Sequence, residues 1–374
     1  MHRNLGLFSF ADENPHQLAG AFFQASLFPY VIFLYFLSRP SSKTPTITNY
    51  GFQYLLVFVA MSIFAGILVK SKYDLSLADA DFVHGSAESV LTISNVLIVY
   101  GLHQAIYTEK HEKPLNFSII KMISMLYAIG ILLYIILGTE YFSVDAHHPF
   151  LGGFGNIPIH DVPHIMPWTY HEEPTNALSI PTWCVHFLSV YEYLIAMSLI
   201  WKYAAATDNP TWKGLTWGML PLHASSICAV THHFFYNAPE LLILVTMQGF
   251  LTFLGNITCM IAAYRIYKHG NLNAEIIQME PKFKSESWVL FTKLTLMVVL
   301  SSFFVKYGEI GLDFPFHPEQ KEIAYSIVFG IPLTIASSYA YSSYSQQKQQ
   351  PEHDGDDLQR DYYTSERTPL RANL

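Results

Sequence analysis

Nine apolar segments alternate with shorter polar ones along the 374-residue chain. As helices rising 1.5 Å per residue, most of them are long enough to cross roughly 30 Å of hydrocarbon. They cover residues 21–37, 54–69, 83–107, 119–137, 180–201, 215–235, 241–267, 288–305 and 324–341. The pattern predicts an all-α fold, a polytopic membrane helix bundle with about nine transmembrane helices.

The composition agrees with this prediction. Hydrophobic residues make up 51% of the chain and charged residues only 13%, which excludes an ordinary soluble globule. The formal net charge of -8 gives no reason to expect nucleic-acid binding. All three cysteines lie inside apolar segments, so no disulfide framework is expected. The segment MHRNLGLFSFADENPHQ has no basic region followed by an apolar core, as a signal peptide has, and it is acidic where a transit peptide is rich in serine and arginine.

The distribution of lysine and arginine predicts which side of the membrane each loop faces. If the two sides of the membrane alternate across nine helices, most of the 21 Lys and Arg fall on the side of the C-terminus. Positive charge marks the cytoplasmic side, which in a plastid is the stroma. The loop at 142–175 contains no Lys or Arg and is expected on the opposite, translocated side with the N-terminus.

The polar segments divide the chain into successive parts. The division is an N-terminal segment (1–20), a four-helix membrane unit (21–141), a His-rich loop (142–175), a three-helix unit (176–267), a linker (268–285), two C-terminal helices (286–343) and a disordered tail (344–374). A weak repeat links Leu91-Thr92 with Leu251-Thr252 and predicts two parallel-repeat halves.

Ionisable residues occur inside the apolar segments, where lipid does not tolerate them, so they are expected to face a shared interior. His84 and Glu88 lie one turn apart on one helix face. Adjacent His232 and His233 point about 100° apart, so at most one should face a given ligand. The predicted cofactor-binding set is His84, Glu88, His186, Glu192, His223, His232 and His233. Each histidine could instead have a purely structural role.

The His-rich loop supplies a second group of candidates. Four of its histidines, His147, His148, His160 and His164, could bind a metal ion. Pro163 lies between His160 and His164 and disfavours a helix there, so these two residues do not suit a helical metal-binding pair. The ligand of the buried set is unknown from sequence; a chlorophyll, a haem or a metal ion would each use imidazole.

Several short motifs carry a family resemblance. SIPTW, then His186 and Glu192 in one helix, then NPTWKGLTWGMLP, THHFFYNAPEL and LTFLGN resemble the hypothetical chloroplast open reading frame forty-nine family of cyanobacteria and plastids. The match covers 176–267. The stretch 26–108, with HGSAESVLTISNVLIVYG, resembles a second membrane domain of unknown function from the same lineages. The resemblance implies a membrane of a plastid or cyanobacterium, either thylakoid or inner envelope, and no particular reaction.

Three functions are compatible with the sequence. The chain has no Gly-rich phosphate loop, no G-x-S-x-G elbow and no C-x-x-C pair, so an enzyme is not favoured. The leading hypothesis is a non-catalytic assembly, stability or pigment-handling factor in the lipid bilayer, with photosynthetic membrane complexes as partners. The alternatives are a transporter or channel for a small cation or metabolite, and a membrane enzyme acting on a lipid or isoprenoid.

Overall fold

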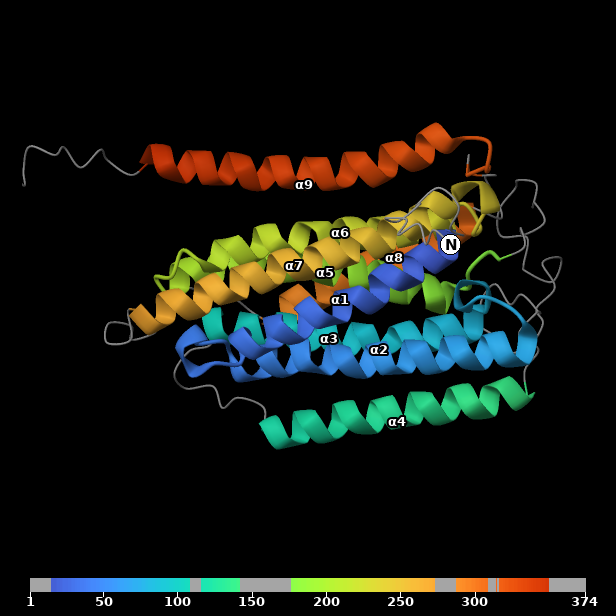
Figure 1. Cartoon of the computed structure of the whole chain (residues 1–374), viewed down its shortest axis with the longest axis horizontal. Coiled ribbons are helices and arrows are strands. Elements are labelled where there is room, and N and C mark those ends of the chain that lie inside the picture. The colour runs from blue at the N-terminus through green and yellow to red at the C-terminus, as the bar shows by residue number, and fades with distance from the viewer. Residues whose placement is uncertain are drawn as a thin grey trace, which may run out of the picture. The chain divides into compact units, whose positions relative to one another are not determined.

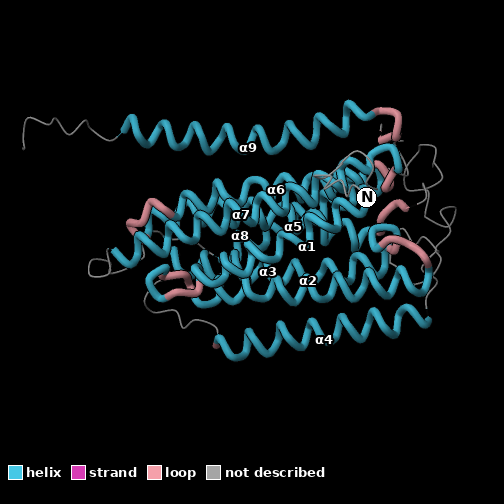
Figure 2. The backbone as a smooth tube through the Cα atoms, viewed as in Figure 1, coloured by secondary structure: helices cyan, strands magenta, loops and turns pink. Residues whose placement is uncertain are grey.

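The structure, a computed structural model, describes residues 15–107, 116–141, 176–272, 287–308, 314 and 316–349. Over these residues the chain is helical and contains no strand (Figure 2), which confirms the all-α prediction. The α-helices are α1 (Pro15–Leu37), α2 (Thr46–Tyr73), α3 (Asp81–Tyr107), α4 (Phe117–Tyr141), α5 (Ile180–Ala206), α6 (Trp212–Phe234), α7 (Leu242–Leu272), α8 (Ser287–Tyr307) and α9 (Lys321–Gln349). Short 3-10 helices lie at Pro40–Ser42 (η1), Leu77–Asp79 (η2) and Pro239–Leu241 (η4).

Eight of these helices are long and apolar enough to cross a membrane, and the one that falls short in hydropathy is α6. Pro221, Ser225 and three histidines lower the mean hydropathy of α6. Helix ends also differ from the sequence prediction. α2 begins at Thr46 and not at residue 54, and α9 continues to Gln349 beyond residue 341. Glutamine and lysine sustain a helix beyond its apolar part, which explains the longer α9.

The chain divides into two compact units, Met1–Pro332 and Leu333–Leu374. The boundary falls inside α9, next to Pro332. The first unit contains α1 to α8 and the beginning of α9. The described part of the second unit is the remainder of α9.

Helices from distant parts of the sequence pack together within the first unit. α1 packs along α7 (Figure 1), and α3 packs against both α2 and α5. α6 contacts α5 and α7, and α8 contacts α5. At the α1–α7 contact a Cβ on Gly249 would lie 2.9 Å from the Ala19 carbonyl oxygen, so a larger residue there would separate the helices. Stretches 21–107 and 180–267 therefore form one interlocked bundle.

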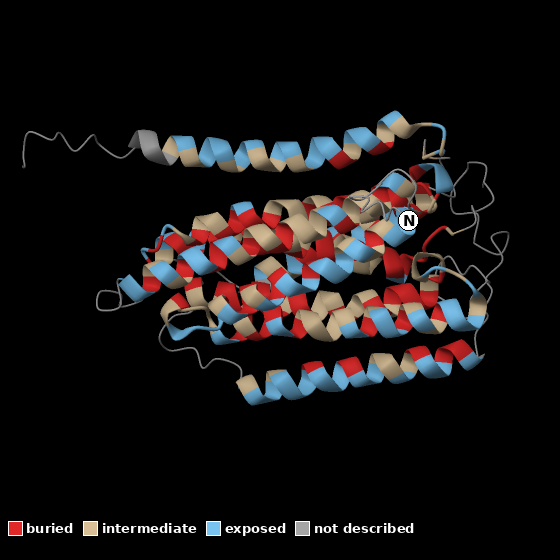
Figure 3. Ribbon diagram, viewed as in Figure 1, coloured by how far each residue is buried: buried red, intermediate tan, exposed pale blue. Residues whose placement is uncertain are grey.

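The outer helices carry apolar side chains on their exposed faces. Ile123 and Leu126 of α4 and Phe304 of α8 are all more than half exposed. Figure 3 shows buried positions concentrated along α3 and α5 and exposed positions recurring along α2 and α4. An exposed surface of this composition suits lipid and not water. The membrane helices thus imply a bilayer as the environment of the protein.

A buried hydrogen bond joins α4 to α2 and yields a first prediction. The Tyr54 hydroxyl donates to the Ser124 carbonyl over 2.6 Å. Tyr54→Phe removes the donor and should lower the free energy of unfolding by about 1 kcal/mol, measured by thermal unfolding in detergent micelles. Tyr35→Phe, which changes an exposed ring, is the control. Equal stability of the two variants would contradict the contribution of this bond.

Candidate functional site: three converging histidines

Three histidines meet at one end of the bundle. His84 lies in the first turn of α3, and His186 lies two turns inside α5. His233 lies in the last turn of α6. Because α5 and α6 are joined by a short turn at Thr207–Thr211, the start of α5 and the end of α6 lie at the same end of the bundle. These three residues are called the histidine triad below.

The triad is compact and almost closed to solvent. The Nε2 atoms of His84 and His186 are 3.1 Å apart. The ring centroids of His84 and His186 are separated by 5.1 Å, those of His84 and His233 by 5.0 Å, and those of His186 and His233 by 4.7 Å. One nitrogen from each ring lies within 4.8 Å of the other two. Each residue is at most 7% exposed. The imidazoles therefore form a nearly equilateral triangle around one point.

Contacts between the N-terminal ends of α3 and α5 place two of these rings. The Ser179 amide donates to the Asp81 carboxylate over 3.0 Å, and the Thr182 hydroxyl lies 3.4 Å from the Asp81 carbonyl oxygen. A Cβ on Gly85 would collide with the Thr182 hydroxyl, so glycine permits this close approach beside His84. Sequence reasoning did not single out Asp81 or Gly85. The adjacency of Gly85 to His84 was the available signal.

Aromatic rings cover one side of the triad. Trp183 is fully buried and lies 6.3 Å from His186 between ring centroids. Its indole stacks on Phe187 at 5.7 Å and on Phe234 at 5.0 Å. An apolar wall of this kind keeps water away and holds the imidazole of His186 in place.

The predicted set of seven residues does not form a single cluster. Three of the seven, His84, His186 and His233, make up the triad, and His223 and His232 lie outside it. His232 lines a neighbouring cavity, in keeping with the 100° offset between adjacent helical residues. Glu88 is half-buried and outside the triad.

Glu192 and His223 lie deeper in the bundle. Glu192 is six residues from His186 on α5, or about 9 Å along the helix axis. Both residues are fully buried, and none of their side-chain oxygens and nitrogens has a hydrogen-bond partner among the described residues. The His223 ring stacks on Tyr193 at 6.0 Å. The other metal candidates, His147, His148, His160 and His164, lie outside the described residues.

The donor set of the triad selects among possible ions. Imidazole nitrogens bind Zn²⁺ at about 2.0–2.1 Å, which places the nitrogens of a tetrahedral site about 3.4 Å apart. The 3.1 Å separation of the His84 and His186 Nε2 atoms is close to this value, and a nitrogen of His233 lies within 4.8 Å of nitrogens of both. Three imidazoles without a carboxylate suit Zn²⁺, Cu²⁺, Ni²⁺ or Fe²⁺. Mg²⁺ and Ca²⁺ prefer oxygen ligands and do not fit.

Two protein families match the two stretches of the chain that contain the triad residues. Residues 19–107 match the family described as "Protein of unknown function (DUF3593)", and residues 177–265 match "Protein of unknown function (DUF2499)". His84 belongs to the first of these regions, whereas His186 and His233 belong to the second. No solved structure matches the chain.

Two curated relatives identify the family. The "Ycf49-like protein" of Synechocystis sp. is 50% identical over 95 residues, which are 25% of this chain and 91% of that relative. The "Uncharacterized protein ycf49" of Cyanophora paradoxa is 36% identical over 83 residues, 22% of this chain and 81% of that relative. The resemblance noted in the sequence is thereby confirmed. The chain is a multi-pass membrane protein that belongs to the Ycf49 family, which is found in cyanobacteria and plastids.

Proposed function

We propose that this protein holds one divalent transition-metal ion in the histidine triad and acts, without turnover of its own, in the assembly or maintenance of photosynthetic membrane complexes. The observation that carries the metal-binding part is the convergence of three buried imidazoles on one point. Three nitrogen ligands leave a further coordination position for water or a ligand from another molecule. The ion would therefore be held firmly and could still be passed on.

An ion fits the triad better than a tetrapyrrole. A haem or chlorophyll takes its axial imidazoles from above or below the macrocycle plane. In the triad all three ring centroids lie within 5.1 Å of one another, and a planar macrocycle between any two rings would collide with the third. The pigment alternatives of the sequence prediction are therefore less favoured than a single metal ion.

The metal-binding part predicts a defined stoichiometry. The full-length protein, purified in detergent and exposed to Zn²⁺, Cu²⁺, Ni²⁺ or Fe²⁺, should retain about one ion per chain after desalting, since three donors make one site. Elemental analysis measures the ratio, and X-ray absorption should show about three imidazole nitrogens near 2.0 Å. Mg²⁺ and Ca²⁺ serve as controls and should wash out. A protein that retains none of the four ions would contradict the proposal.

The assembly part rests on the occurrence of the family in cyanobacteria and plastids. Photosynthetic complexes contain many metal cofactors, and a membrane protein that carries an exchangeable ion suits their assembly. The corresponding location is the thylakoid or the inner envelope. Affinity purification from such membranes should recover photosystem or cytochrome subunits together with this chain. If neither photosystem nor cytochrome subunits are recovered, the assembly part of the proposal is contradicted, whereas the metal-binding part is unaffected.

Cation transport is a second candidate, favoured by Glu192 and His223. These fully buried groups lie deeper than the triad and have no hydrogen-bond partner among the described residues. Polar groups at that depth in a membrane bundle mark ion or proton pathways. Protein reconstituted in liposomes should then carry a cation flux that Glu192→Gln or His223→Ala abolishes. Sealed liposomes without flux would exclude transport.

A further inference from the structure

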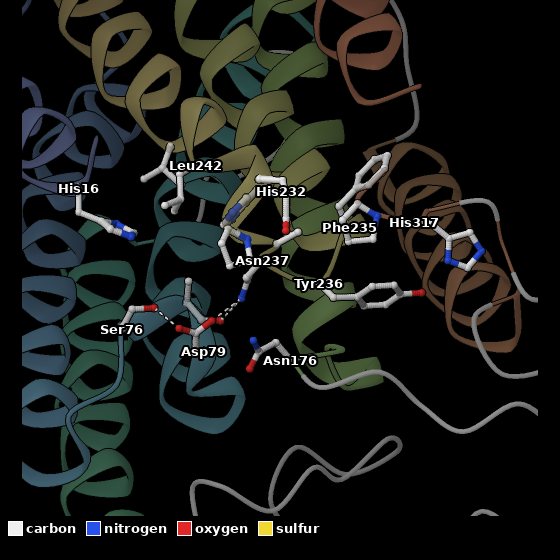
Figure 4. A pocket seen from close by; sticks show the side chains of 16 residues that line it. His16, Ser76, Asp79, Asn176, His232, Phe235, Tyr236, Asn237, Leu242 and His317 are labelled. Carbon is white, nitrogen blue, oxygen red and sulfur yellow. Dashed lines mark hydrogen bonds between the residues drawn. The ribbon is translucent and has the colours of Figure 1, made fainter. Parts of the chain in front are cut away.

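A cavity of about 720 Å³ opens beside the end of α6 that carries the triad (Figure 4). Its walls come from distant parts of the chain: the start of α1, the 3-10 helix η2, the turn after α6 and the segment before α9. The histidine and carboxylate residues of the lining are His16, Asp79, His232, Glu240 and His317. This space is called the vestibule below.

The vestibule has the charge of a cation-binding surface. The described residues of its lining include two carboxylates and three imidazoles and no lysine or arginine. A concave surface of one charge sign raises the local concentration of oppositely charged ions. The occupant that this lining favours is a hydrated divalent cation, and an anion is disfavoured.

Asp79 is held in a fixed position at the vestibule wall. One of its carboxylate oxygens accepts a hydrogen bond from the Ser76 hydroxyl at 2.7 Å. The other accepts from the Asn237 side-chain amide at 2.9 Å (Figure 4), and the same amide donates to the Ala78 carbonyl at 3.0 Å. These bonds tie η2 to the turn after α6. The carboxylate therefore stays at the wall when an ion approaches.

His232 lies between the vestibule and the triad. It lines the vestibule yet is only 6% exposed, and its Nε2 has no hydrogen-bond partner among the described residues. A buried polar atom without a partner is costly, which makes it a candidate for ligand contact. The His232 ring centroid is 6.3 Å from that of His233. One ion could therefore move from His232 to the triad over a short distance.

We infer that the vestibule is the port through which a hydrated divalent transition-metal ion enters, and that His232 transfers the ion to the triad. This inference rests on the proposed metal-binding function and adds the route to it. Asp79 and Glu240 attract the hydrated ion. His232 replaces one of its waters, and the triad replaces most of the rest.

The test compares the rate of metal loading with the final occupancy. Apo-protein of full length in nanodiscs is mixed with Zn²⁺ and a chromophoric chelator that reports free ion. His232→Leu and Glu240→Gln should each reach the wild-type ratio of ion to chain but load more slowly. For Glu240→Gln the expected factor is about ten, the low end of electrostatic effects on association rates, and loss of the transferring imidazole in His232→Leu should slow loading at least as much. Asp208→Asn removes an exposed carboxylate at the α5–α6 turn, at the far end of the bundle, where its φ of 52° suits asparagine. This control should load at the wild-type rate.

The outcomes separate the two proposals. A wild-type protein that binds no ion would overturn the metal-binding function and the inference with it. A wild-type protein that binds one ion while His232→Leu loads at an unchanged rate would overturn the inference alone. If His232→Leu folds normally and loses the ion altogether, then His232 is a permanent ligand and not a transfer residue. Slower loading of Asp208→Asn to the same extent would show a bulk charge effect instead of a port.

Discussion

Replacing His186 with alanine should weaken transition-metal binding by at least about 100-fold. Loss of a residue that only hydrogen-bonds to a metal ligand typically weakens binding by about 10- to 100-fold, and loss of the ligand itself should cost more. His186 is central to the triad because its Nε2 lies 3.1 Å from that of His84 and its ring lies 4.7 Å from that of His233. Without it, two imidazoles from α3 and α6 remain and cannot enclose an ion. Competition against a chelator of known affinity measures the loss. His84→Ala and His233→Ala should have effects of similar size.

A matched control separates ligation from general damage. His223→Gln changes a buried histidine of α6 that lies outside the triad, and it should leave the affinity unchanged. His186→Cys supplies a thiolate at the same position and should restore part of the affinity. With Co²⁺ it should add the absorption band of a sulfur ligand. If the His223 variant loses metal while the His186 variant keeps it, the triad is not the site.

Replacing Glu192 with methionine should raise the stability of the protein. Glu192 is fully buried, and neither of its carboxyl oxygens has a hydrogen-bond partner among the described residues. A buried polar group without a partner costs about 1–3 kcal/mol, and methionine fills a similar volume without that cost. The melting temperature in micelles should therefore rise by several degrees, on the order of 2–4 °C per kcal/mol.

The exposed carboxylate of Glu322 provides the control for this substitution. Glu322→Met at the start of α9 should change the melting temperature little. A fall in the melting temperature of Glu192→Met would mean that the carboxyl group has a partner in the working protein. That result would favour cation transport, and flux through Glu192→Gln protein in liposomes would then decide between the two functions.

The helices were predictable from sequence because a bilayer imposes long apolar segments on any chain that crosses it. The ends of α2 and α9 were not, since polar residues can extend a helix once its apolar part is formed. α6 shows the reverse case. A helix is present where the sequence predicts one, although α6 is not apolar enough to be a candidate membrane span, and its neighbours α5 and α7 pack against it.

The triad was only partly predictable. Because ionisable side chains are costly in lipid, the histidines inside apolar segments could be expected to be buried. The rotation of 100° per residue in an α-helix indicated that His232 and His233 would point in different directions. Neither argument could show that His84 meets His186, because that depends on how α3 docks on α5. The docking is set by local contacts of Gly85 and Asp81, which have no distinctive pattern in a single sequence.

The division of the triad between two family regions has a consequence for shorter relatives. The 95 residues matched in the Synechocystis relative make up 91% of its length, so that protein is too short to hold both regions. A polypeptide built from the second region alone has no counterpart of α3 and offers at most two of the three imidazoles. Completing the coordination there would require a separate subunit. The present chain joins both contributors covalently, which fixes their ratio at one to one.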